Sequence, residues 1–279
     1  MMPVCEVCHH HCNLKEGMTG MCMARTCRDG EIVCTNYGLI TSIALDPIEK
    51  KPLSRFYPGS MVVSVGSYGC NLRCPFCQNH TISYGFDPIL SLPQTRYIAP
   101  DELVGIAASY REDGNIGIAF TYNEPLIGYE YVRDTSKLAH EAGLKTVLVS
   151  NGCVSEKIHD EIIPYIDAMN IDLKGFTDSY YRNILKGDRK MVMNFITAAA
   201  KESHVELTTL IVPGYNDTDE EIMDLSSWIA GIRDDIPLHI SRYFPRFNMT
   251  DVPATEVSKV YHLAELAGQQ LKYVYTGNC

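Results

Sequence analysis

The chain has 279 residues, of which 46% are hydrophobic, and a formal net charge of −10 at pH 7. This length allows one barrel-sized domain with a small appendage. The negative charge argues against a nucleic-acid partner, because binding by counterion release requires a dense basic face. Eleven cysteines without a leader pattern predict a cytoplasmic protein with metal-bound thiols. No apolar run reaches the roughly 18 residues of a membrane span.

The first 36 residues are dense in Cys, His and Gly and contain few large apolar side chains. C-x2-C followed by C-x9-C is typical of a four-thiolate metal site, and so short a segment needs a metal to fold. We predict an N-terminal Cys-rich module and connector over 1–60, with zinc or a second iron–sulfur cluster as its metal. His11 is a substitute ligand, and free structural thiols are the remaining alternative. The predicted ligands are Cys5, Cys8, Cys12 and Cys22.

A proline-rich connector at 45–60 ends in a Pro-Gly turn signal. We expect it to be an ordered linker draped over the outside of the next domain. Its basic residues Lys50, Lys51 and Arg55 are expected to face solvent, or to contact a partner or an anionic substrate.

From residue 61 onward, short β-branched runs alternate with helical patterns, which is typical of βα units around a parallel sheet. One helix is predicted to open at Pro100, since proline is tolerated in the first helical turn. The pattern therefore predicts an α/β fold, a partial (β/α)6-type TIM barrel over 61–279, with its chemistry at the C-terminal ends of the strands. The predicted strands are 61–65, 116–120, 145–149, 168–171, 205–212, 238–241 and 272–275.

The loop after the first of these strands carries Cys70, Cys74 and Cys77 at C-x3-C-x2-C spacing. Three cysteines within eight residues face one centre only if the backbone wraps around it. Three thiolates hold three irons of a [4Fe–4S] cubane and leave the fourth iron open. The alternatives are three unrelated thiols, or a zinc site whose fourth ligand comes from elsewhere, His80 being the nearest.

Polar clusters that contain or adjoin a Gly or Pro follow the next four strands, at 121–125, 150–152, 172–174 and 213–217. Asn216 or Asp217 is expected to cap the following helix. Caps alone do not explain four polar strand ends beside a cysteine loop. The sequence therefore predicts one site where these ends converge.

The cysteine spacing, with an aromatic residue before Cys77, resembles the signature of the radical S-adenosylmethionine (SAM) superfamily. The resemblance implies that the open iron binds SAM and that an electron from the cluster splits it into methionine and a 5′-deoxyadenosyl radical. That radical then abstracts hydrogen from a substrate, so the chain is expected to be an enzyme that requires anaerobic handling.

From 61 to about 275 the chain is similar to the branch typified by pyruvate formate-lyase activating enzyme. In that branch a Gly-Gly-Glu-like segment binds the SAM amino group, and Glu124 stands in this chain as the acceptor. Positions after the third and fourth strands approach the ribose and carboxylate of SAM through charge-assisted hydrogen bonds, the strong kind. The implied SAM contacts are Tyr122, Asn123, Glu124, Ser150, Asn151, Asp172 and Lys174.

The subgroup that the chain resembles most is the radical SAM enzyme of the AmmeMemoRadiSam system, through 46–53, 77–79 and 272–278. The resemblance implies a small-molecule or protein substrate and an electron donor such as flavodoxin or ferredoxin. A glycyl-radical enzyme activase is an alternative, although the larger activases insert a cysteine module where this chain has no cysteine between Cys77 and Cys153. A non-catalytic iron–sulfur electron carrier or scaffold is the third interpretation.

Overall fold

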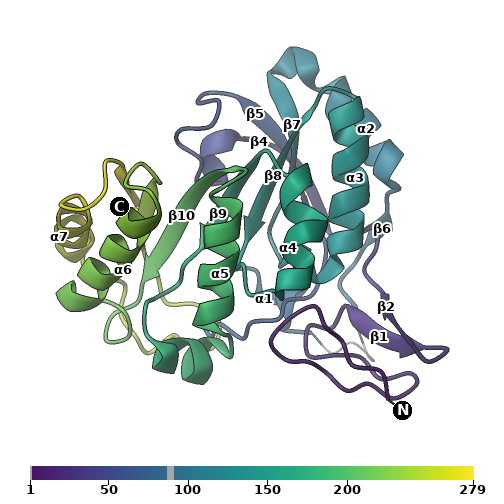
Figure 1. Cartoon of the computed structure of the whole chain (residues 1–279), viewed down its shortest axis with the longest axis horizontal. Helices are drawn as coiled ribbons and strands as arrows, with labels where there is room; N and C mark the ends of the chain where they lie inside the picture. The colour runs from purple at the N-terminus through teal and green to yellow at the C-terminus, as the bar shows by residue number, and fades with distance from the viewer. Residues whose placement is uncertain (1, 87–90) are drawn as a thin grey trace.

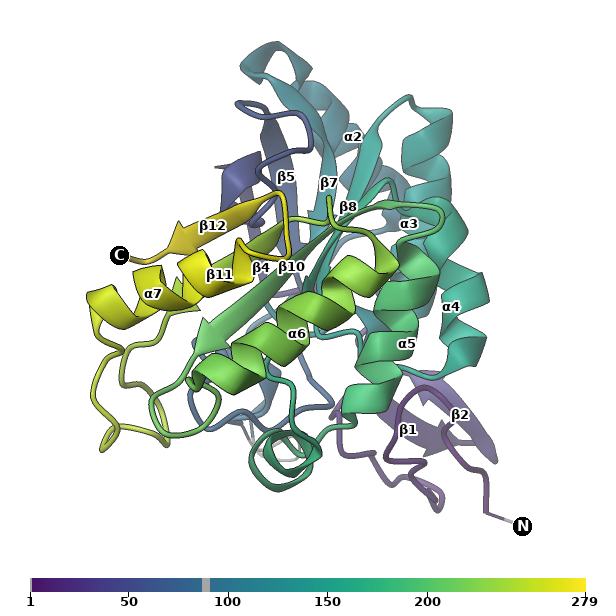
Figure 2. The same ribbon diagram turned by 60° about the vertical axis from the view of Figure 1, so that its left-hand side comes forward.

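The computed structural model describes residues 2–86 and 91–279. Its centre is an eight-stranded sheet in the order β12-β11-β10-β9-β8-β7-β5-β4, whose strands β4 to β10 are labelled in Figure 1 and β11 and β12 in Figure 2. All strands but β4 run parallel, so the α/β prediction is confirmed and the predicted strands differ from the observed ones only at their ends. The parallel strands are β5 (Met61–Gly66), β7 (Asn115–Phe120), β8 (Lys145–Ser150), β9 (Ala168–Asp172), β10 (His204–Ile211), β11 (Leu238–Arg242) and β12 (Val274–Gly277).

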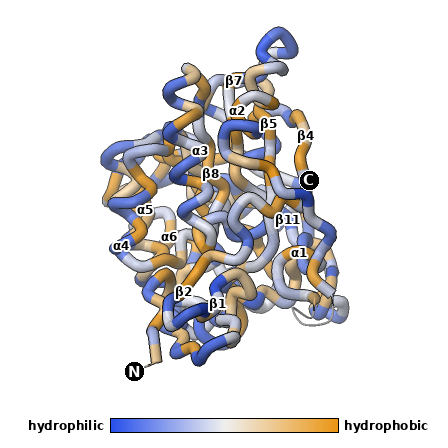
Figure 3. Tube along the Cα trace, turned by 90° about the vertical axis from the view of Figure 1, so that its right-hand side faces the viewer, coloured by the Kyte–Doolittle hydropathy of each residue, from blue (hydrophilic) through white to orange (hydrophobic). Residues whose placement is uncertain are grey.

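Helices connect the strands and cover one face of the sheet (Figure 2). The predicted helix opening at Pro100 is confirmed as α2. Along α4 and α5 hydrophobic and hydrophilic positions both occur, as expected for helices that bury one face (Figure 3). The α-helices are α1 (His80–Ser83), α2 (Pro100–Ser109), α3 (Tyr129–Glu141), α4 (Glu156–Ile162), α5 (Arg189–Ala199), α6 (Asp219–Ile232) and α7 (Val257–Ala267). The other helices are η1 (Ile48–Lys50), η2 (Arg111–Asp113), η3 (Pro125–Gly128), η4 (Ile163–Tyr165) and the π-helix η5 (Tyr180–Leu185).

The N-terminal segment contains an antiparallel hairpin of β1 (Arg25–Arg28) and β2 (Glu31–Cys34). A further short pair joins β3 (Leu39–Ile40) to β6 (Arg96–Tyr97). The buried Arg25 guanidinium donates two hydrogen bonds of 2.6 Å to the carboxylate of Glu130 on α3. This bidentate contact attaches the module to the barrel.

Strand β4 (Ser42–Pro47) was not among the predicted strands. It pairs antiparallel with β5 over its full length, from Ser42 opposite Gly66 to Pro47 opposite Met61. The predicted boundary at residue 60 remains a prediction, but the structure places this strand from the N-terminal part in the central sheet.

The connector does not drape over the outside of the barrel, and that expectation was wrong. Ile48, Leu53 and Phe56 are buried against apolar residues of β5, β7, β8 and β9, namely Val62, Ala119, Val147 and Ala168. These residues alternate along their strands with those that pack under the helices, such as Val63, Ile118, Leu148 and Met169. The connector therefore fills the inner, concave face of the sheet. We call residues 46–56 the plug.

Glu206 on β10 joins the plug to the sheet. Its fully buried carboxylate accepts hydrogen bonds from the amides of Ser54 and Arg55, at 2.9 and 2.8 Å, and contacts the rings of His204 and His239. Burial alone would raise the pKa of Glu206, but these hydrogen bonds outweigh it and lower the pKa to about 2. A buried acceptor with four donors stabilises the charged form.

Replacing Glu206 by Gln should lower the free energy of unfolding by about 1–3 kcal/mol at pH 7, because buried donors lose an ionised acceptor. A carboxyl with a lowered pKa stabilises the fold above its unfolded value of 4.5, and this contribution is lost as pH falls toward about 2. Urea unfolding at several pH values measures both effects. Glu202→Gln, at an exposed position, is the matched control, and equal stability of the two variants would contradict the assignment.

Among the residues that the structure describes, no helix is both long and apolar enough to cross a membrane.

Candidate active site

The cysteine loop lies directly after β5, at the C-terminal edge of the parallel sheet. Its three thiols are free, and Cys77 N donates to Cys74 O at 3.1 Å within a tight turn. Burial raises the pKa of Cys70 well above its usual value, and the nearby charges of Glu124 and Cys74 raise it further. Burial also raises the pKa of Cys74 to about 11, against the opposing effect of Lys174. The three thiols therefore lie close together, with Glu124 and Lys174 beside them.

A cubane suits this donor set because each thiolate binds a different iron, so the sulfurs need not converge on one point. In the described part of the chain, no three His, Cys, Asp or Glu side chains are placed to hold a single metal ion. His80, the alternative fourth ligand of a zinc site, contacts Cys77 O at 3.2 Å through Nδ1, and its ring stacks on Phe247 at 4.1 Å between centroids. The residues present thus fit the predicted cluster.

The backbone of the loop is held by partners from distant parts of the chain. Cys70 N donates to Cys22 O at 3.1 Å, and Arg73 N donates to Leu185 O at 2.8 Å. The side chain of Asn71 donates to Cys153 O at 2.7 Å. Because buried backbone groups need partners, the N-terminal module, η5 and the end of β8 all contribute to the shape of the loop.

Glu124 follows β7 and joins the ends of two strands. Its carboxylate accepts from Leu126 N at 3.0 Å, Ser150 Oγ at 2.7 Å and Asn151 N at 2.8 Å, and the residue is only 2% exposed. Burial raises the pKa of Glu124 to about 7 despite these hydrogen bonds. The predicted acceptor for the SAM ammonium group therefore already binds three protein donors, all but one of them on Oε1.

Asn151 connects this strand end to the cysteine loop. Its side-chain Nδ2 donates to Asn71 Oδ1 at 2.9 Å and lies 3.7 Å from Cys70 Sγ, and its Oδ1 accepts from Cys153 N at 2.8 Å. Amide donors to a cysteine sulfur are among the contacts that set the potential of an iron–sulfur cluster. The structure thus places Asn151 against the sulfur of Cys70, a predicted cluster ligand.

Tyr122 and Asn123 attach the end of β7 to the cysteine loop. Tyr122 O accepts from Asn79 Nδ2 at 2.7 Å. Asn123 Oδ1 accepts from Ser67 N at 2.9 Å, and its Nδ2 donates to Gly69 O at 3.1 Å. The segment that stands in place of Gly-Gly-Glu is therefore rigidly connected to the loop that carries the thiols.

Asp172 and Lys174 lie at the end of β9. They form an ion pair of 2.9 Å in which both side chains remain partly exposed. Burial opposes the charge of Lys174, but Asp172 and Cys74 outweigh it and raise the pKa of Lys174 above its usual value. A permanently charged ammonium group beside the thiols provides a site for an anionic group of a ligand.

At this edge of the sheet one expectation was wrong and the role of one residue was missed. The helix cap was assigned wrongly, because Thr218 is the N-cap of α6 and its side chain accepts from Glu221 N. Asn216 instead closes its own loop, accepting from Val212 N at 2.7 Å and donating to Lys174 O at 2.8 Å. The role of Asn79 was missed, although it is the first asparagine after the last loop cysteine and could have been found there.

The N-terminal cysteines are also gathered. Burial raises the pKa of Cys8 to about 12 and that of Cys22 to about 11, and charges on the neighbouring thiols contribute to both shifts. Cys5 and Cys12 are among these neighbours. His11 is exposed. As placed in this structure, the four thiols do not converge on a single ion. The metal of this module therefore stays a prediction, and binding it would require the thiols to move closer together.

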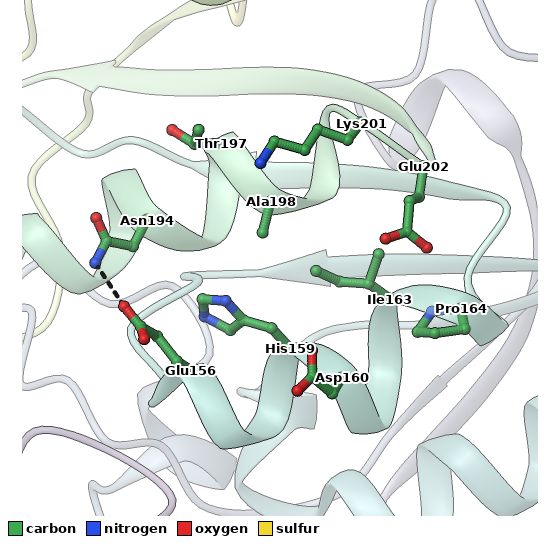
Figure 4. A pocket seen from close by; sticks show the side chains of 10 residues that line it. All are labelled: Glu156, His159, Asp160, Ile163, Pro164, Asn194, Thr197, Ala198, Lys201 and Glu202. Atoms are coloured by element: carbon green, nitrogen blue, oxygen red, sulfur yellow. Dashed lines mark hydrogen bonds between the residues drawn. The ribbon is translucent and has the colours of Figure 1, made fainter.

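A hollow also lies elsewhere, between α4 and α5 (Figure 4). It has a volume of about 480 Å³ and is lined mainly by polar side chains, including His159, Asn194 and Lys201. Asn194 donates to Glu156 at 3.2 Å across it. Because these helices cover the outer face of the sheet, this groove is separate from the edge where the thiols lie.

A family model, the radical SAM superfamily, matches residues 64–229, which is more than half of the chain. The chain is a member of the radical SAM superfamily. The enzymes of this superfamily use a [4Fe–4S] cluster and SAM. The two expected cofactors and the assignment of this chain as an enzyme are therefore confirmed at the level of the family. The match includes the three loop cysteines and the ends of β5, β7, β8 and β9.

Relatives of this radical SAM protein include MJ0808 of Methanocaldococcus jannaschii, 41% identical over 98% of this chain and 80% of that protein. Pyruvate formate-lyase 1-activating enzyme of Escherichia coli is 25% identical over 54% of this chain and 61% of its own length. This chain thus matches less than two thirds of that enzyme.

Two solved structures show the fold alone. A radical SAM methyltransferase from Sphaerobacter thermophilus is 16% identical, with a TM-score of 0.59 over 79% of this chain and 67% of that one. SuiB of Streptococcus suis bound to S-adenosylmethionine is 12% identical, with a TM-score of 0.59 over 76% of this chain and 48% of that one. The partial TIM barrel predicted from the sequence is confirmed.

Glu124→Gln should lower the free energy of unfolding by about 1–3 kcal/mol at pH 5, because the introduced amide donor faces the Asn151 donor. Since the pKa of Glu124 is raised, its carboxyl stabilises the fold fully below its unfolded value of 4.5, and this contribution is lost as pH rises through about 7. Urea unfolding between pH 4.5 and 8 should therefore show the gap between variant and wild type narrowing. A gap that widens with pH would contradict the assignment.

Proposed function

We propose that Cys70, Cys74 and Cys77 hold the [4Fe–4S] cluster of this radical SAM enzyme and that SAM binds between the cysteine loop and the ends of β7, β8 and β9. When bound, the cluster supplies the electron that splits SAM into methionine and a 5′-deoxyadenosyl radical, which abstracts hydrogen from a substrate. The observation that carries the proposal is the set of three free, mutually close thiols at the C-terminal edge of the parallel sheet.

The remaining residues have distinct proposed roles. Lys174, charged and partly exposed beside Cys74, binds the carboxylate of SAM. Asp172 holds the ammonium group of Lys174 in place through Oδ2, and its other carboxylate oxygen can accept hydrogen bonds from hydroxyl groups of the ligand. Glu124 keeps Ser150 and Asn151 in register, and its Oε2, which accepts one protein hydrogen bond, would accept a second from the SAM ammonium group. Tyr122 and Asn123 contribute through their fixed backbone.

We propose a protein or small-molecule substrate and a flavodoxin or ferredoxin as electron donor in the cytoplasm. The 25% identity to a pyruvate formate-lyase activating enzyme supports a protein substrate as one of the two classes, and a glycyl-radical enzyme is the candidate within it. Membership of the superfamily favours catalysis over the non-catalytic electron carrier.

Cys74→Ala should abolish the release of 5′-deoxyadenosine from SAM under anaerobic reducing conditions, because the cluster would lose one of its three ligands. Chromatographic assay of the reconstituted protein measures this release. Cys279→Ala, at an exposed thiol, is the control and should react like the wild type. Release by a variant lacking Cys70, Cys74 and Cys77 together would overturn the proposed function.

We also propose that Cys5, Cys8, Cys12 and Cys22 bind a metal that stabilises the N-terminal module. Elemental analysis of the variant lacking the three loop cysteines should then find about one equivalent of zinc, the usual content of a closed four-thiolate site. Iron with sulfide would instead support the second cluster, one main-chain hydrogen bond from the cysteine loop through Cys22. A metal-free variant would leave these four residues as ordinary thiols.

A further inference from the structure

A buried ion pair connects the plug to Tyr122, which borders the proposed SAM site. The Asp46 carboxylate accepts from Lys51 Nζ at 2.9 Å and from the hydroxyl of Tyr122 at 2.9 Å. Lys51 Nζ also lies 5.0 Å from the centre of the Tyr122 ring. The side chain of Lys51 is only 3% exposed, so the expectation that it faces solvent was wrong.

Tyr122 has a backbone conformation that its own chemistry does not favour. Its φ is +72°, in the left-handed region that non-glycine residues rarely adopt. Gly66 makes room for it, because a Cβ there would lie 2.8 Å from the ring and 2.9 Å from the Cβ of Tyr122. Contacts at the far end of the side chain are therefore needed to hold this residue in place.

The backbone of the same residue faces the proposed cofactor site. Tyr122 O accepts from Asn79, two residues after the last cysteine of the loop. Asn123 and Glu124, which follow it, bind Ser67 and the end of β8 respectively. A change in the Tyr122 side chain would thus shift the peptide groups of 121–124 relative to the thiols.

We propose that Asp46 and Lys51 are positioning residues for SAM: through the Tyr122 hydroxyl and ring they fix segment 121–124 against the cysteine loop. The inference rests on the proposed function, since it assigns a role at that same SAM site. Both residues lie outside the 64–229 region that the family model matches. The plug is therefore a part of the SAM site that the superfamily match does not include.

The neighbouring lysine provides a matched control. Lys50 Nζ contacts the other oxygen of Asp46 at 3.1 Å, but its side chain is 66% exposed. Exposed ion pairs contribute little to stability or geometry, and Lys50 does not contact Tyr122 in the described structure. Lys50→Met and Lys51→Met thus make the same chemical change on the same carboxylate, at an exposed and at a buried position.

The experiment measures SAM binding to anaerobically reconstituted holoenzyme by equilibrium dialysis, together with iron content and thermal midpoint. Tyr122→Phe and Lys51→Met should each raise the dissociation constant of SAM about tenfold, because each removes a hydrogen bond to a charged group that holds segment 121–124, and such a bond contributes enough free energy to shift an equilibrium by about that factor. Iron content should stay equal to that of the wild type. The double variant Tyr122→Phe/Lys51→Met should have the same dissociation constant for SAM as the single variant that binds SAM less tightly, because the two residues act as one unit.

Tyr122→Phe keeps the inference testable if Lys51→Met fails to fold, because it removes only one hydroxyl. SAM binding by Tyr122→Phe as tight as by Lys50→Met, at a lower thermal midpoint, would show that the contacts only stabilise the plug and would overturn the inference. If the wild type and Lys50→Met both fail to bind SAM, the proposed function fails instead, so the two failures are distinguishable.

Discussion

The cysteine loop has no regular secondary structure, yet it is largely buried, and the rest of the site depends on how its backbone is satisfied. Its amides and carbonyls cannot pair with one another in a ladder, so they need partners from elsewhere. Cys22 supplies one, Leu185 another, and the hydroxyl of Tyr84 donates to Cys74 O. A single loop thereby brings the N-terminal module, η5 and α1 to the same edge of the sheet.

The strand ends are joined by a second set of contacts centred on charged groups. Glu124 connects the ends of β7 and β8, and Asp172 with Lys174 completes the edge at β9. The loop contacts and the Glu124 contacts are largely buried polar networks, which give a specific geometry only when every member is satisfied, whereas the Asp172–Lys174 pair remains partly exposed. The proposed site therefore combines three thiols from one loop with anchoring side chains from the ends of three strands, β7, β8 and β9.

The sequence predicted correctly those structural features that depend on a short local pattern of residues. Strands 61–66 and 145–150 were found because β-branched runs mark them, and the loop cysteines because their spacing is local. Strand β4 was missed because proline and acidic residues lower its strand propensity. The burial of Lys51 could not be predicted, because it depends on Asp46 and Tyr122, and the latter lies 71 positions away in the chain.

The inner core also determines which pieces of this protein can exist separately. A fragment beginning at residue 64, where the superfamily match starts, would lack β4, the plug and the first half of β5, and would expose Ala119, Val147 and Ala168. It would also leave the first half of β7 without its partner strand, open to pairing with another chain. The smallest autonomous form of the barrel must therefore begin before Ser42, well upstream of the first residue that the family model matches.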